Sequence, residues 1–132
     1  ASDVYKRQRA HWACGRSVEA LDMAAAAVIA APQDIAALLL FAALLAEERR
    51  HEDAVSVLQD ALRRRPEEPQ VLLRLGIALT RAGRHEDATH VLGRCAAAAP
   101  QLPGLAVARA QAALARRDMP DLVFIDDIQR RR

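Results

Sequence analysis

The chain has 132 residues, of which 52% are hydrophobic but only 3% aromatic, and alanine supplies much of the apolar fraction. This length allows one domain. A composition that is poor in large side chains but rich in alanine, the best helix former, favours thin layers of closely packed helices. The formal net charge of +2, from 19 basic and 17 acidic residues, argues against the one-sided basic surface of a nucleic-acid-binding protein.

The first predicted helix spans residues 17–31 and ends before Pro32. Proline cannot continue the backbone hydrogen bonds of a helix. Gly15 and Arg16 predict a turn, which would separate this helix from an earlier one that includes His11.

A pair of helices is predicted next, at residues 35–48 and 52–64, joined by a turn at residues 49–51. Asp34 caps the first helix, and Pro66 closes the unit after the second. The side chains expected to face inward are spaced mostly three and four residues apart: Leu38, Phe41, Leu45, Ala54, Leu58, Ala61 and Leu62.

A second pair follows at residues 69–82 and 86–99, joined by a short turn and ended by Pro100. Gly76, in the middle of its first helix, costs about 1 kcal/mol of helix propensity relative to alanine. We therefore expect the partner helix to approach closely, with Gly76 facing the small side chain of Ala88. The expected inward residues of this pair are Leu72, Leu75, Leu79, Ala88, Leu92 and Cys95.

A last helix is predicted over residues 105–116, and residues 118–132 then depart from the pattern. This final segment has the cap and the first-turn proline of a capping helix, but its Val-Phe-Ile run between acidic residues also fits a short strand that opens another domain. We favour the capping helix because it continues the array. The residues of the last helix that stand in register with earlier inward residues are Ala106, Ala110 and Ala113.

A fixed interval runs through the sequence. The same spacing separates Pro32 from Pro66 and Pro66 from Pro100, and it also separates the segment 51–54 (His-Glu-Asp-Ala) from its recurrence as residues 85–88. A period of about 20–50 residues marks a stacked repeat array, and the interval found here, 34, is the length of the tetratricopeptide repeat.

The apolar and small residues of the two helix pairs resemble the tetratricopeptide repeat signature. In the second pair these residues are Leu72, Leu75, Gly76, Leu79, Ala88, Leu92, Cys95 and Pro100, and the first pair repeats them as Leu38, Phe41, Ala42, Leu45, Ala54, Leu58, Ala61 and Pro66. The resemblance implies an all-α fold, an α-solenoid of antiparallel helix pairs with about three to four repeats. The expected repeats cover residues 9–34, 35–68, 69–102 and 103–132, the last of them degenerate. Residues 1–8 fit poorly and are interpreted as a remnant, and the absence of an initiating Met suggests a fragment of a longer protein.

Catalytic and metal-binding signatures do not emerge from the sequence. His85 and His90 are five residues apart, which places them about 140° apart around a helix, so we expect them to share no metal ion. No nucleophile, base and orienting group can be combined. We predict no catalytic residues, no cofactor and no metal site.

By the same resemblance, the first helices of successive repeats line a concave groove that binds an extended or helical peptide. Leu73 and Ile77 would form one apolar ridge in it, which argues against a grip on a terminal carboxylate and favours an apolar strip or amphipathic helix. The alternative is that these residues pack on adjacent repeats or on a missing part of the chain. The predicted groove residues are Leu39, Ala43, Gln70, Leu73, Ile77, Arg81, Gln111 and Leu114.

The resemblance therefore implies a non-catalytic protein–protein interaction scaffold, whose partner is another protein or a peptide. The alternative is an accessory array attached to an enzyme, such as a transferase, and the full reading frame would separate the two. We expect no nucleic acid and no small-molecule substrate among the partners. We also expect no membrane span, because no stretch of about 18 apolar residues occurs. The sequence leaves the cellular location undecided, and we favour the cytoplasm.

Overall fold

The structure, a computed structural model, describes residues 2–116 of the chain, with side chains from residue 15 onward. Every regular element within this range is a helix, which confirms the predicted all-α fold. The helices are α1 (Ser2–Ala30), α2 (Ile35–Glu47), α3 (His51–Arg64), α4 (Pro69–Arg81), α5 (His85–Ala98) and a further helix at residues 105–116.

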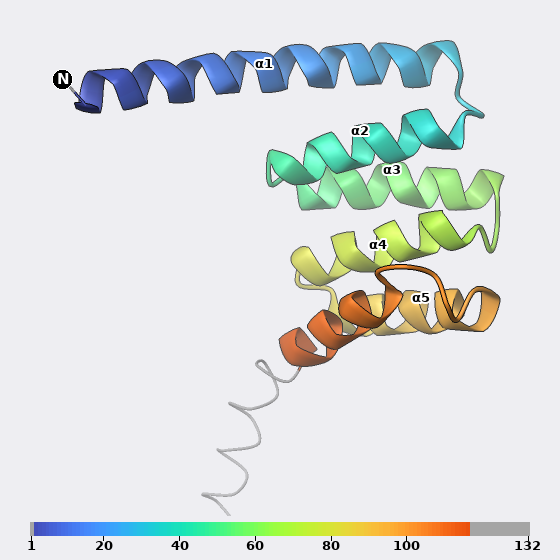
Figure 1. Cartoon of the computed structure of the whole chain (residues 1–132). Helices are drawn as coiled ribbons and strands as arrows, with labels where there is room; N and C mark the ends of the chain where they lie inside the picture. Colours follow the sequence, from blue (N-terminus) through green and yellow to red (C-terminus); the bar gives the residue numbers. More distant parts are fainter. Residues whose placement is uncertain (1, 117–132) are drawn as a thin grey trace, which may run out of the picture.

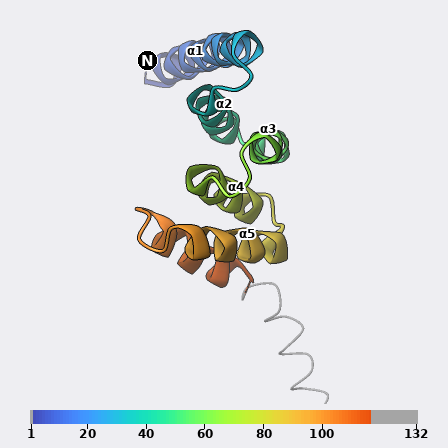
Figure 2. The same cartoon turned by 90° about the vertical axis from the view of Figure 1, so that its right-hand side faces the viewer.

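The helices stack one upon the next in chain order, as Figure 1 shows. α1 packs on α2, α2 on α3, α3 on α4, and α4 on α5, and α2 also contacts α4. In the view of Figure 2, α2 and α4 lie on one side of the stack and α3 on the other. This zigzag of helix pairs is the predicted α-solenoid.

The predicted ends of α2 to α5 agree with the structure to within one residue. Asp34 caps α2 by accepting a hydrogen bond from the backbone N–H of Ala36 at 3.0 Å. Pro69 stands in the first turn of α4, where its missing N–H leaves no hydrogen bond unmade. Arg49 and Gly83, which hold equivalent positions in successive repeats, both adopt positive φ directly after the C-caps of α2 and α4, so local chemistry sets these ends.

The turn predicted at Gly15 and Arg16 is wrong, because α1 continues through both residues and also contains His11. Gly15 is not among the glycines with positive φ, and nothing lies within 4 Å of the point where its Cβ would stand. A single glycine costs a helix only about 1 kcal/mol. With no proline nearby and no neighbouring element against it, Gly15 does not interrupt the helix.

The core consists of two clusters of mainly aliphatic side chains between successive helices, a large one and a small one that contains Leu38, Ala61 and Val71. All the residues predicted to face inward from α2 to α5 are buried, except Phe41 and Leu62, which are half-buried. The largest fully buried side chains are Leu45, Leu58, Leu72, Leu79, Leu92, Val55, Val71 and Cys95.

Gly76 marks a close helix contact, as predicted, but the neighbour it faces is Leu92 and not Ala88. A Cβ added at Gly76 would lie 2.3 Å from Cδ2 and 2.5 Å from Cγ of Leu92. The branched end of this leucine occupies the space that the missing side chain leaves. The expectation of a small facing residue was wrong because a long side chain on the next turn of α5 reaches the same place.

The helix at residues 105–116 turns a different face to the core than predicted. Its buried residues are Leu105, Ala108 and Ala112. The face that in α4 carries Leu72 and Leu79 belongs to the core shared with α5, and the corresponding partner of the helix at residues 105–116 would follow residue 116 in the sequence. That segment, with the predicted capping helix or strand, lies outside the described residues. The residues predicted to face inward but found exposed are Ala106, Ala110 and Ala113.

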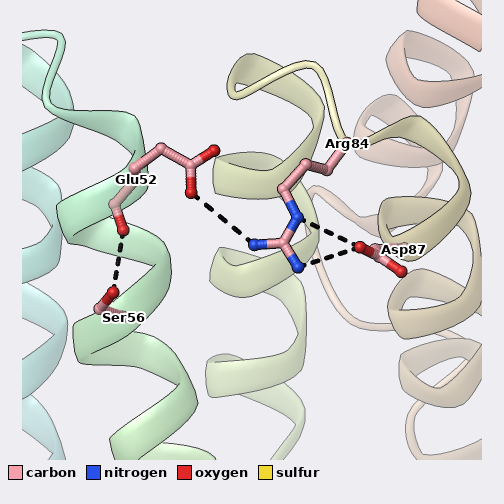
Figure 3. A network of polar contacts seen from close by, with 4 residues as sticks. All are labelled: Glu52, Ser56, Arg84 and Asp87. Atoms are coloured by element: carbon pink, nitrogen blue, oxygen red, sulfur yellow. Dashed lines mark hydrogen bonds and ion pairs between the residues drawn. The ribbon is translucent and has the colours of Figure 1, made fainter.

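A polar contact joins the two helix pairs at the edge of the stack (Figure 3). Arg84, in the turn before α5, pairs with Asp87 at 3.0 Å and reaches Glu52 of α3 at 3.7 Å. Arg50, at the equivalent position of the preceding repeat, makes the same local pair with Asp53 at 2.8 Å. All five side chains are substantially exposed, so these pairs contribute little stability. Of the three, only the contact between Arg84 and Glu52 connects successive repeats.

Candidate peptide-binding groove

A depression of about 270 Å³ lies between α2 and α4, with α3 at its base. Its floor is apolar and consists mainly of alanine, so the side chains that line it are short. Three charged side chains, Glu47, Arg74 and Arg81, stand among the lining residues. We call this depression the α2–α4 groove, and its lining residues are Ala42, Ala43, Ala46, Glu47, Ala54, Leu58, Arg74, Ile77, Ala78 and Arg81.

Three of the residues predicted for the groove meet there. Ala43 comes from α2, and Ile77 and Arg81 come from α4. Ile77 is half-buried and packs against the core with part of its surface. It is therefore held in place while leaving apolar surface open to a partner.

Two other predicted residues contribute mostly to the core. Leu73 is only 6% exposed, and its Cδ2 lies 3.8 Å from the point where a Cβ on Gly104 would stand. The turn before residues 105–116 therefore passes close to this side chain. Leu39 is half-buried and packs against both core clusters. Neither residue lines the α2–α4 groove.

The remaining predicted residues are exposed and lie away from this depression. Gln70 is in the first turn of α4, and Gln111 and Leu114 are on the helix at residues 105–116. Leu114 is 61% exposed. Their place in a binding surface stays a prediction.

The family follows from the stacked helix pairs together with a direct sequence comparison. A family profile described as tetratricopeptide repeat matches residues 45–117 of the chain. The chain belongs to the tetratricopeptide repeat family. Tetratricopeptide repeats generally mediate protein–protein interactions, and the family is typically a non-catalytic scaffold. A search of the curated proteins found no significant match to this sequence.

Two residues of α4 that lie next to Ile77 in the groove were not predicted from the sequence. Arg74 and Ala78 line the groove: Arg74 lies three residues before Ile77 and Ala78 lies four residues after Arg74, and residues at these spacings are neighbours on a helix surface. The signal was present in this spacing. It was overlooked because the earlier repeat has Leu40 in place of Arg74, so no repeated residue marked the position.

The α2–α4 groove of this tetratricopeptide array is smaller than a usual small-molecule pocket, which encloses about 300–1,000 Å³. Among its lining residues, only one carboxylate and two guanidinium groups are ionisable. These groups can orient a bound chain but do not assemble a nucleophile with a base. The thiol of Cys95 lies elsewhere, fully buried, and desolvation raises its pKa, which keeps it protonated and unreactive.

Two histidines considered in the sequence analysis lie on α5. His85 begins α5 and is half-buried, whereas His90 is exposed on the same helix.

No helix in the described part of the chain is both long and apolar enough to span a bilayer.

Proposed function

We propose that this chain is a non-catalytic interaction scaffold that binds a peptide or helix of another protein in the α2–α4 groove. The observation that carries the proposal is the apolar depression between two first helices of successive repeats, with half-buried Ile77 at its side. The groove borders the core, so its shape is fixed before a partner arrives. Binding to such a prepared surface costs little conformational entropy in the scaffold.

The composition of the groove suggests how a partner would be held. Alanine side chains at positions 42, 43 and 46 of α2 and at position 78 of α4 allow the backbone of a partner to approach closely. An apolar side chain of the partner would then contact Ile77 and the base formed by Leu58. A few buried apolar anchors usually carry most of the affinity of such a surface.

The proposal can be tested by peptide display on the whole chain. Random peptides of about 16 residues, which span about 24 Å as helices, are selected for binding, and the affinities of enriched peptides are measured by fluorescence anisotropy. Ile77→Glu should weaken them by about tenfold or more, equivalent to about 1.4 kcal/mol, because it places a charge against the apolar anchor. Ala43→Gln should weaken them through steric filling of the groove.

The matched control is Leu40→Glu. Leu40 is an aliphatic residue of α2 that is 55% exposed and does not line the groove, whereas Ile77 is a half-buried residue of α4. Circular dichroism and thermal melting would establish that each variant folds. If folded Ile77→Glu and Ala43→Gln proteins bind the peptides as the parent does, the α2–α4 groove is not the binding site.

A further inference from the structure

Four arginines at the turns and on the helices α3 and α5 have acidic partners: Arg50 with Asp53, Arg63 with Asp60, Arg84 with Asp87 and Glu52, and Arg94 with Glu67. Other exposed arginines have no such partner within residues 15–116, among them Arg64, Arg109 and Arg116. Both arginines of α4, Arg74 and Arg81, are exposed, and within residues 15–116 neither has a hydrogen-bond or ion-pair partner.

The sequence of α4 explains this difference. The helix contains no acidic residue, so its arginines have no partner within it. The carboxylates of α3 and α5, by contrast, include two in the first turn of each helix, Glu52 and Asp53 in one and Glu86 and Asp87 in the other. Positive charge is therefore left unneutralised on α4, at the groove, whereas Arg63 of α3 and Arg94 of α5 have acidic partners.

Arg74 and Arg81 stand on either side of Ile77, and all three line the α2–α4 groove. Seven residues of helix separate the two arginines, which corresponds to about 10 Å along the axis and to the same helical face. An apolar contact is thus flanked by two guanidinium groups. Glu47 is the one carboxylate among the lining residues, and it comes from the end of α2.

We propose that the partner segment is an acidic amphipathic helix of another protein, with two carboxylates seven residues apart and an apolar side chain between them. This inference rests on the function proposed above and specifies the chemistry of the partner. The carboxylates pair with Arg74 and Arg81, and the apolar side chain, three or four residues after the first carboxylate, contacts Ile77. Two acids and one apolar residue at this spacing share one helical face, and guanidinium groups pair well with carboxylates.

Nucleic acid is the other class of acidic macromolecule that unpaired arginines attract. Proteins that bind single strands usually combine such charges with aromatic side chains on which bases stack. The lining of this groove contains no aromatic residue and consists mostly of alanine, with Leu58 and Ile77. The groove therefore favours an acidic protein helix.

The test uses the whole chain and a pair of synthetic peptides with acetylated and amidated ends, so that no terminal charge contributes. One peptide carries glutamates at positions 4 and 11 and leucines at positions 7 and 8, on an alanine-rich helical background, and the other carries lysines in place of the glutamates. At low salt we expect the glutamate peptide to bind with an affinity at least about tenfold higher than that of the lysine peptide. This difference in affinity should decrease as added salt screens the charges.

Charge reversal assigns this preference to residues. The Arg74→Glu, Arg81→Glu double variant should reverse it and favour the lysine peptide. The matched control is the Arg109→Glu, Arg116→Glu double variant. These two arginines are also seven residues apart and exposed, but they line a separate depression with Leu92, so their reversal should leave the order of the peptides unchanged.

Several outcomes would overturn the inference. If Ile77→Glu abolishes binding but the parent protein binds both peptides equally well, the groove function is retained and the acidic partner is rejected. If the Arg109→Glu, Arg116→Glu variant no longer prefers the glutamate peptide, the acidic contact lies outside the α2–α4 groove, at the depression that these two arginines line. Binding of a random single-stranded oligonucleotide of about 20 nucleotides, lost in the Arg74 and Arg81 variant, assigns these arginines to nucleic acid. Binding of neither peptide and recovery of no groove-dependent peptide by display rejects the proposed function itself.

Discussion

At the scale of single residues, the contact between Gly76 and Leu92 sets how closely α4 and α5 approach. Leu92 is only 1% exposed, so its branched end has little free space into which it can move. Ala42 and Leu58 hold the corresponding positions of the preceding repeat, and there a Cβ is accommodated. The two helix pairs therefore share a pattern but differ in how their side chains interlock.

Gly76→Ala should lower the free energy of unfolding by about 1–2 kcal/mol. The approach of 2.3 Å places the overpacking cost in the upper part of the usual range of about 1–3 kcal/mol, and the gain in helix propensity offsets about 1 kcal/mol of it. Gly76→Leu should cost more, because more atoms must fit into the same space. Urea unfolding followed by circular dichroism measures both changes.

Gly93→Ala provides the matched control for this prediction. Gly93 is also in the interior of a helix, α5, but nothing lies within 4 Å of the point where its Cβ would stand. This change should stabilise the protein by about 0.5–1 kcal/mol through propensity alone. An unchanged or higher stability of Gly76→Ala would mean that the contact with Leu92 is looser than the structure has it.

At the scale of whole elements, α1 differs from the other helices in length. It has 29 residues, whereas α2 to α5 have 13 or 14, and in Figure 1 it extends beyond the end of α2. A helix–turn–helix unit would have placed a loop near Gly15. Instead the backbone hydrogen bonds continue, so the part of α1 that precedes this position is not folded back as a separate helix.

Gly15→Ala tests this continuity. In a continuous helix with open space around position 15, alanine should raise helical content and stabilise the protein by up to about 1 kcal/mol. Gly83→Ala should do the opposite. Gly83 also has nothing within 4 Å of its Cβ position, but its φ is +83°, a conformation that costs a side-chain-bearing residue about 1–2 kcal/mol.

Thermal melting and far-ultraviolet circular dichroism compare the two variants. Loss of helical signal in Gly15→Ala, as large as that in Gly83→Ala, would indicate that the chain turns at residue 15 after all.

At the scale of the whole molecule, the stack has no single centre, and each helix is stabilised by its neighbours. α4 contributes seven buried residues and packs between α3 and α5, whereas α2 contributes three. Burial is therefore greatest in the middle of the array. The α2–α4 groove borders this helix, so the backbone of its wall on the α4 side is held by the largest set of buried residues.

Hydrogen exchange should reflect this gradient. We expect the slowest amide exchange in α4 and in the parts of α3 and α5 that pack on it, and faster exchange in α1, because local opening requires less free energy where fewer contacts are lost. Mass spectrometry of proteolytic fragments measures these rates. Uniform protection from α1 to α5 would show that the described array opens only as one cooperative unit.

Local chemistry explains why much of the fold could be predicted. Asp34 caps the start of α2, Pro69 stands in the first turn of α4, and Pro66 and Pro100 follow the ends of α3 and α5. Residues spaced three and four apart determine which faces of these helices are buried. These signals act within a few residues of the chain, and their recurrence at a fixed interval indicated the family. Parts of the site were also accessible in this way, since Ala43, Ile77 and Arg81 stand at corresponding groove positions of their helices.

The sequence by itself determined the helices α2 to α5, their pairing and the faces that they bury, because each depends on neighbouring residues and on a repeat that is visible in the sequence. Only the tertiary structure decided that α1 runs through Gly15, that Leu92 fills the space beside Gly76, and that Leu73 lies beneath the turn at Gly104 while Ile77 stays open between two unpaired arginines. These features depend on which side chain from another element reaches a given space. A periodic pattern identifies the face on which a residue lies, but not how far a side chain from the neighbouring helix extends.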